Sequence, residues 1–338
     1  MNPIWAFIKT TRPVNILIIV STMYAMRYFV GIDYALMDSA LDIHIYGGIS
    51  DFKFLLLTII MVFLAASGNI INDYFDVKVD RINKPERITI DRGLKRRVAM
   101  AAHHTLNGLA VVLGFYVGWA EQVWFYSFLP VIIAGALWFY SFYLKKTFLL
   151  GNVLVALVVS IVPIWATYGT LTSPLINSAN LEANSFPISQ LYIFYATIIM
   201  GYTIQAYVIS LFREIVKDAE DVEGDRLFGY RTMPIVWGWA KTRNLLLITQ
   251  FAWLVVLGLI CYFITVTYIP LLGLTFGLLV VIPFLLSLMS MSKKNIQKKH
   301  FSSASLWLKL TLGGGLIYSY FIPELMGSFL YQHINLMQ

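Results

Sequence analysis

Apolar runs long enough to cross a membrane recur along this chain, and they constrain its fold more than any other feature. Each run has roughly 18 to 25 residues, the length that an α-helix needs to cross the hydrocarbon core of a bilayer. The chain is 59% hydrophobic and only 13% charged, whereas ordinary soluble domains carry about 25% charged residues. We place nine such runs, near residues 14–32, 52–75, 97–118, 122–143, 148–170, 188–213, 244–265, 269–291 and 304–332. The sequence therefore predicts an all-α integral membrane protein with about nine transmembrane helices bundled around a central cavity.

The basic residues predict how this bundle lies in the bilayer. Of the 25 Lys and Arg residues, only Arg27, Lys53 and Lys309 fall outside the segments that share a side with the N-terminus. Basic residues concentrate on the cytoplasmic side of membrane proteins, so we expect a cytoplasmic N-terminus. We interpret residues 1–338 as a single multi-pass domain in the cell membrane. The net charge of +7 then follows from topology and calls for no nucleic-acid partner.

A first group of acidic residues lies at the inner end of the second apolar run. Asn72, Asp76 and Asp80 are spaced i, i+4 and i+8, so their side chains share one face of a helix. The connection that follows, residues 76–97, mixes acidic residues closely with Lys and Arg. We therefore expect this segment to form one cytoplasmic active-site loop.

A second group follows the sixth run, in the inner segment 214–243. Asp218, Asp221 and Asp225 are spaced i, i+3 and i+7 and form another stripe if the helix continues, although Gly224 favours fraying. Two carboxylate stripes at one depth repel each other unless a cation lies between them. Magnesium is usually held by one or two carboxylates together with substrate phosphates, so the two stripes predict a Mg²⁺ site facing a diphosphate. The alternative is a pair of solvated helix ends balanced by neighbouring basic residues.

Several other side chains near these stripes are candidates for binding substrate. Guanidinium and ammonium groups donate charge-assisted hydrogen bonds to diphosphate oxygens and stabilise a leaving group. The basic candidates are Lys84, Arg87, Lys145, Arg213, Lys217 and Arg231. Each of them is equally explained, taken singly, as a determinant of topology. Gln205 lies on the inner half of the sixth run and is expected to line the cavity, while the ring of Tyr140 could stabilise a cation.

These motifs resemble those of the UbiA-type superfamily of intramembrane prenyltransferases. Its members carry an Asn-x-x-x-Asp-x-x-x-Asp motif after the second helix and an Asp-rich motif after the sixth, which here read NDYFDVKVD over residues 72–80 and DAEDVEGD over 218–225. The early segment RPVN matches as well, so Arg12, Asn15 and Asp73 join the expected substrate-binding residues. The stretches around both motifs are most similar to the branch of archaeal digeranylgeranylglyceryl phosphate synthases and their bacterial relatives.

The resemblance implies a Mg²⁺-dependent transfer of a prenyl group, geranylgeranyl in this branch, from its diphosphate to a lipid-phosphate hydroxyl such as that of geranylgeranylglyceryl phosphate. The partners would be a prenyl diphosphate, a lipophilic acceptor and the bilayer, with the active site facing the cytoplasm. Tyr140 and Lys145 stand for the catalytic Tyr-x-x-x-Lys pair of the family, although five residues separate them here instead of four. The expected metal ligands are Asn72, Asp76, Asp80, Asp218, Asp221 and Asp225.

Two alternatives stay open at this stage. An aromatic acceptor of the quinone or chlorophyll type would use the same metal and the same donor. A protein of another class, an ion-coupled transporter, also places carboxylates in a membrane, but its central site lies near the bilayer midplane. The acidic stripes here lie at the inner ends of their spans, which favours the enzyme.

Overall fold

The apolar runs coincide with helices in the computed structural model, which describes residues 2–41, 49–172, 188–268, 270–293 and 296–321. The last run, 304–332, is helical as far as Ser319, and its residues from 322 onward lie outside the described residues. Within the described ranges the chain forms helices and turns and no strand, only an isolated bridge between Ile90 and Leu94.

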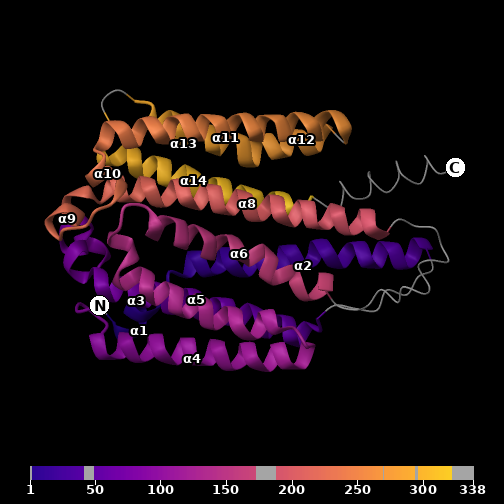
Figure 1. Ribbon diagram of the computed structural model, residues 1–338, viewed down its shortest axis with the longest axis horizontal. Helices are drawn as coiled ribbons and strands as arrows, with labels where there is room; N and C mark the ends of the chain where they lie inside the picture. The colour runs from indigo at the N-terminus through magenta and orange to yellow at the C-terminus, as the bar shows by residue number, and fades with distance from the viewer. Residues whose placement is uncertain (1, 42–48, 173–187, 269, 294–295, 322–338) are drawn as a thin grey trace.

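The helices divide into two sets that follow one another along the chain. The first set is α1 (Pro3–Thr11), α2 (Pro13–Leu41), α3 (Asp51–Asn83), η1 (Pro85–Arg87), α4 (Arg96–Glu121), α5 (Trp124–Phe142), η2 (Leu144–Lys146) and α6 (Leu150–Thr172). The second is α8 (Ile188–Glu220), α9 (Val222–Leu227), α10 (Met233–Val236), α11 (Trp239–Thr267), α12 (Pro270–Phe276), the π-helical η4 (Gly277–Val281), α13 (Ile282–Met291) and α14 (Lys298–Ser319). The long helices lie side by side, and α1, α9 and α10 gather at one end of the bundle, on the left of Figure 1.

Six of the described helical segments are long and apolar enough to cross a bilayer, and the number becomes seven if α1 and the first part of α2, bent by 48° at Arg12, count as one span. The helices α8 and α14 pack beside these spans in the same bundle (Figure 1). The predicted fold class, an all-helical multi-pass membrane protein, is thereby confirmed. The number nine and the cytoplasmic N-terminus stay predictions.

Helix α3 is the most enclosed of these spans and forms the centre of the first set. Its neighbours are α4, α5, α2 and α6, and the buried indole of Trp165 donates a hydrogen bond to the carbonyl of Leu57 at 3.2 Å. Small residues allow helices in membranes to approach closely, and a Cβ added at Gly68 would lie 2.8 Å from a methyl group of Leu137. Such packing holds α3 in place up to the end of the helix at which the first stripe lies.

The connection after α3 folds back against α1 at this end. The hydroxyls of Thr10 and Thr89 are 2.6 Å apart and buried, and the amide of Asn69 donates to the carbonyl of Thr11 at 3.0 Å. Ile90 packs in a small apolar cluster with α1, α3 and α4. These contacts fix the junction between α1 and α2 next to the first stripe.

Both segments that were expected to be loops are partly helical. Helix α3 continues to Asn83 and α8 continues to Glu220, so Asp76 and Asp218 project from helices and not from loops. The second stripe is not continuous, because the helix breaks at Asp221, ahead of Gly224. The break falls at a residue whose side chain contacts Lys84.

Candidate active site

Asp76 lies in the middle of the first stripe and is held from two sides. The amide nitrogen of Asn72, one helical turn earlier, donates to its Oδ2 at 2.8 Å. The ammonium group of Lys145, which η2 presents, forms an ion pair with its Oδ1. The side chain of Lys145 is only 6% exposed, so this pair is shielded from water. The predicted catalytic lysine therefore contacts a predicted metal ligand.

Arg12 reaches the same helix from the junction of α1 and α2. Its backbone φ of 56° lies in the left-handed region, which residues other than glycine rarely adopt, and its N–H bonds the carbonyl of Lys9 at 3.2 Å. The guanidinium donates to Asp73 at 2.7 Å. Asn15 begins the next turn, and its N–H donates to the carbonyl of Arg12 at 2.9 Å. The RPVN segment thus forms a bend that places a guanidinium beside the first stripe.

The carboxylates of the second segment are held by different groups. Asp218, on the last turn of α8, accepts a hydrogen bond from the amide of Asn152 at the start of α6, at 2.8 Å. Asp225 lies in the short helix α9, and its carbonyl accepts from the N–H of Tyr230 at 2.9 Å. Neutral groups therefore contact Asp218 and Asp225, whereas a lysine contacts Asp76.

Asn83, the last residue of α3, joins the two segments directly. Its Oδ1 accepts from the backbone N–H of Gly224 at 2.8 Å, and its amide nitrogen lies 3.4 Å from Oδ1 of Asp225. A Cβ added at Gly224 would come within 2.6 Å of the Asn83 oxygen. Only glycine therefore fits at this approach of α9 to the end of α3.

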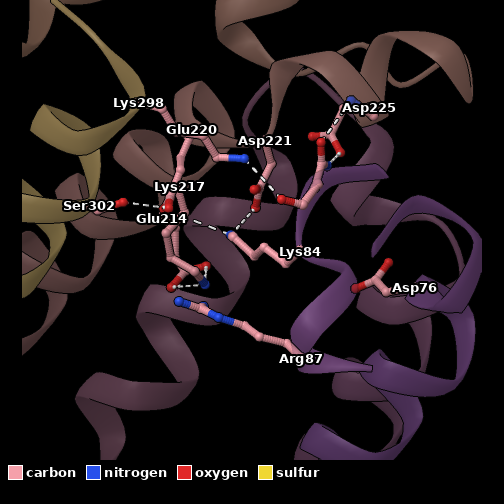
Figure 2. Close-up of polar contacts among 12 residues, drawn as sticks. Asp76, Lys84, Arg87, Glu214, Lys217, Glu220, Asp221, Asp225, Lys298 and Ser302 are labelled. Atoms are coloured by element: carbon pink, nitrogen blue, oxygen red, sulfur yellow. Dashed lines mark hydrogen bonds and ion pairs between the residues drawn. The ribbon is translucent and has the colours of Figure 1, made fainter. Parts of the chain in front are cut away.

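Lys84 forms the second link between the segments. Figure 2 shows its side chain extending between Asp76 and the acidic residues of the second segment. Its ammonium donates to Oδ2 of Asp221 at 2.6 Å and lies 3.8 Å from Glu220. Asp221 occupies the N-cap position of α9, yet its carboxylate turns to Lys84 instead of capping the helix. The ion pair therefore lies at the break between α8 and α9.

The charges of the two segments act on each other across this junction. Burial, together with the nearby carboxylates of Asp218, Asp221 and Asp76, raises the pKa of Asp225 from its ordinary value to about 8. Asp80 likewise lies within electrostatic range of Asp221. The two acidic stripes therefore meet at one end of the bundle, as a shared anionic region.

The oxygen atoms in this region suit magnesium. Within the described ranges no group of three acidic, His or Cys side chains is already arranged around a metal ion. Two buried oxygens, Oδ1 of Asn72 and Oδ1 of Asp221, find no hydrogen-bond donor in that same part of the chain. Magnesium prefers hard oxygen ligands and takes only one or two carboxylates when substrate phosphates complete its shell. The donor set fits a metal that arrives with a diphosphate.

The remaining predicted residues divide between this region and its surroundings. Tyr140 lies within electrostatic range of Asp76 and Asp218, so the structure brings it to the acidic region despite its shifted spacing. The side chain of Arg87 is 67% exposed, and Arg231 is exposed too. Gln205 lies elsewhere, where its carbonyl oxygen accepts from the indole of Trp253 at 3.0 Å.

The last two predicted cations, Arg213 and Lys217, surround a carboxylate that the sequence analysis missed. Glu214 is buried and accepts from Arg213 at 3.0 Å and from Lys217 at 2.8 Å. It stands four residues before Asp218, so the spacing of the stripe was a sufficient signal for it. Asn83 and Asn152 were also missed, and no sequence pattern marks a single amide at the end of a helix.

Comparisons with known proteins agree with this geometry. The model of the UbiA prenyltransferase family matches residues 43–313. A digeranylgeranylglyceryl phosphate synthase of Thermococcus sibiricus is 32% identical over 234 residues, which cover 69% of this chain and 68% of that protein. The synthase of Methanothermobacter thermautotrophicus is 30% identical over 240 residues, covering 70% and 68%.

Two solved structures share the fold. One, described as giving insights into the biosynthesis of digeranylgeranylglyceryl phosphate synthase in membranes, aligns with a TM-score of 0.57 at 21% identity and covers 95% of this chain and 99% of its own. The other, an apo UbiA homologue from Aeropyrum pernix, aligns with a TM-score of 0.57 at 13% identity and covers 89% and 97%. With four-fifths of its length matched by the family model, this chain belongs to the UbiA prenyltransferase family.

Proposed function

We propose that this protein transfers a geranylgeranyl group from its diphosphate to the hydroxyl group of a glycerol-phosphate lipid, in a Mg²⁺-dependent reaction at the cytoplasmic face of the cell membrane. Prenyl transfer itself follows from membership of the family. The observation that carries the finer proposal is the junction of the two acidic segments. Asn83 bridges to Gly224 and Lys84 bridges to Asp221, beside buried oxygens that lack donors within the described residues.

The metal would be held by Asn72, Asp76, Asp80, Asp218, Asp221 and Asp225, and it would neutralise the diphosphate as that group leaves. Lys84 and Lys145 already lie among these side chains, each paired with a carboxylate. Their ammonium groups are in place to donate to the diphosphate oxygens and so to stabilise the leaving group.

The remaining steps belong to the organic substrates. The bond between the allylic carbon and the diphosphate oxygen breaks, the acceptor oxygen bonds to that carbon, and the hydroxyl proton passes to the departing diphosphate. A ring such as that of Tyr140 stabilises the positive charge on the allylic carbon by its quadrupole. The membrane keeps bulk water away from this carbon, which disfavours simple hydrolysis of the donor.

The acceptor is assigned from the named relatives. Two proteins described as digeranylgeranylglyceryl phosphate synthases are about 30% identical to this chain over two thirds of its length. This supports a lipid-phosphate acceptor over an aromatic acceptor of the quinone or chlorophyll type. The alternative of an ion-coupled transporter is not supported, because the chain belongs to a family of prenyltransferases.

The test is a transfer assay with the purified protein in nanodiscs. Labelled prenyl diphosphates of several lengths are combined with geranylgeranylglyceryl phosphate, hydroxybenzoate or a naphthoate, with magnesium or with a chelator. We expect label to enter geranylgeranylglyceryl phosphate only when magnesium is present. Label in an aromatic product alone would overturn the acceptor while leaving the prenyltransferase in place.

A further inference from the structure

Lys309 is a cation that neither the topology nor the acidic region explains. It lies in the middle of α14, in one of the apolar runs, and it is one of the three basic residues that do not fall on the inner side. Its side chain forms no ion pair with any carboxylate of the described residues. An ammonium group within a membrane helix is costly unless it faces the bundle interior and meets an anion.

The packing of α14 on α8 shows what Lys309 faces. The Tyr202 hydroxyl donates to the carbonyl of Gly315 at 3.1 Å, and the Ser302 hydroxyl donates to Glu220 at 2.7 Å. Because the two contacts join opposite ends of α8 and α14, the helices are antiparallel. Lys309 of α14 and Arg213 of α8 both lie between these two contacts along their helices. Lys309 is half-buried there and lies within electrostatic range of both Arg213 and Arg12.

Positive charge exceeds negative charge in this cluster. Arg12 pairs with Asp73, while Arg213 and Lys217 share the single carboxylate of Glu214. Lys309 adds a further cation, and the buried Nε of Arg213 has no acceptor within the described residues. We name Arg12, Arg213, Lys217 and Lys309 the cationic cluster. Counted against the two carboxylates that pair with it directly, the cluster carries a surplus of two positive charges in a partly desolvated place, which favours the binding of an anion.

We propose that the cationic cluster binds the phosphate monoester headgroup of the acceptor lipid, with Lys309 as a specificity-determining residue. The proposal rests on the proposed function and names a second anion site for it. The acidic stripes suit a diphosphate that brings metal ions, whereas the cationic cluster suits a phosphate that brings none. Two separate anion sites allow donor and acceptor to be bound together without competing for the same cations.

The first experiment measures binding without reaction. Lysophosphatidate and its uncharged counterpart, a monoacylglycerol, are titrated into detergent-purified protein with no prenyl diphosphate and no magnesium, and thermal stabilisation is followed. Lys309→Met removes the charge from an apolar helix at little cost to folding, and Lys309→Arg restores it. Lys299→Met is the matched control, because Lys299 is an exposed lysine of the same helix.

We expect lysophosphatidate to stabilise the wild-type protein, Lys309→Arg and Lys299→Met, and monoacylglycerol to stabilise none of them. The apparent Kd of Lys309→Met for lysophosphatidate should rise about tenfold or more, as expected for the loss of one charge-assisted hydrogen bond. A Kd within twofold of the wild-type value would overturn the proposal, and so would an equal weakening in Lys299→Met.

The second experiment separates this site from the proposed reaction. In the transfer assay, Lys309→Met should raise KM for geranylgeranylglyceryl phosphate about tenfold and leave KM for the prenyl diphosphate unchanged. A rise in the donor KM alone would overturn the assignment to the acceptor. If the wild-type protein binds lysophosphatidate through Lys309 yet never prenylates the phosphorylated lipid, the proposed function fails and the phosphate site stands.

Discussion

The two acidic segments have similar spacing in the sequence but are built differently. The first runs along the end of α3, a continuous helix of 33 residues, and an ammonium group holds its central carboxylate. The second is broken at Asp221, and neutral amides hold Asp218 and contact Asp225. The first is fixed by its own helix, whereas the second depends on contacts from α3 and α6. Mutations should therefore act on them in different ways.

The largest effect on turnover is expected at Asp76, in the middle of the first acidic segment. Asp76→Asn removes a charge from the proposed metal site and from the ion pair with Lys145 at almost constant volume. We expect kcat for prenyl transfer to fall by about 10³-fold or more, the scale of a lost electrostatic contact to a transition state. Asp91→Asn, in the connection between α3 and α4 next to Arg96, is the control and should leave kcat unchanged. Full turnover by Asp76→Asn at saturating magnesium would falsify the metal assignment.

A smaller effect is expected where the broken segment meets α3. Gly224→Ala forces its Cβ against the Asn83 side chain, so either the bond between Asn83 and the Gly224 N–H breaks or α9 moves and carries Asp225 with it. A displacement of about 1 Å near a reaction centre costs on the order of 10²-fold in rate. Gly201→Ala is the matched control, since its Cβ would meet nothing within 4 Å on α8. Equal kcat values for both alanine variants would show that the junction does not position the site.

Removing the hydrogen bond that α6 gives to Asp218 should have a more modest effect, which is confined to metal binding. Asn152→Ala leaves Asp218 without the amide that orients it. Removing such a supporting hydrogen bond typically weakens metal binding by about 10-fold or more. The half-saturating magnesium concentration should rise accordingly while kcat at saturating magnesium stays close to the wild-type value. A loss of kcat that magnesium does not restore would assign Asn152 a different role.

The smallest effect concerns pH. The pKa of Asp225 is raised to about 8, so in the absence of metal its proton stays bound in the folded protein long after an unfolded chain has released it. Stability should therefore be lost progressively as pH rises from about 4 to about 8. Thermal unfolding of the metal-free protein across this window is the measurement, and Asp225→Asn should flatten the slope. An unchanged slope in that variant would assign the pH dependence to other groups.

The periodic features were predictable from the sequence and the single contacts were not. Apolar length predicted the helices, and the spacing of Asn72, Asp76 and Asp80 predicted their shared face, because both depend only on helix geometry. The ion pair at the break could not be predicted, because Lys84 lies 137 residues from Asp221 in the sequence. Local propensity pointed to Gly224 instead, whose real constraint is its close approach to Asn83.

The ion pairs at the acidic stripes have a consequence for the order of binding. Asp76 is paired with Lys145 and Asp221 with Lys84, so the site already carries its own counter-ions. A magnesium ion alone would have to displace these ammonium groups and leave them buried without partners. A diphosphate alone would draw the ammonium groups away and leave the carboxylates without partners. When metal and diphosphate bind together, the metal pairs with the carboxylates and the diphosphate pairs with the ammonium groups. Every charge then keeps a partner. Magnesium and donor should therefore bind synergistically, each raising the affinity for the other by the same factor.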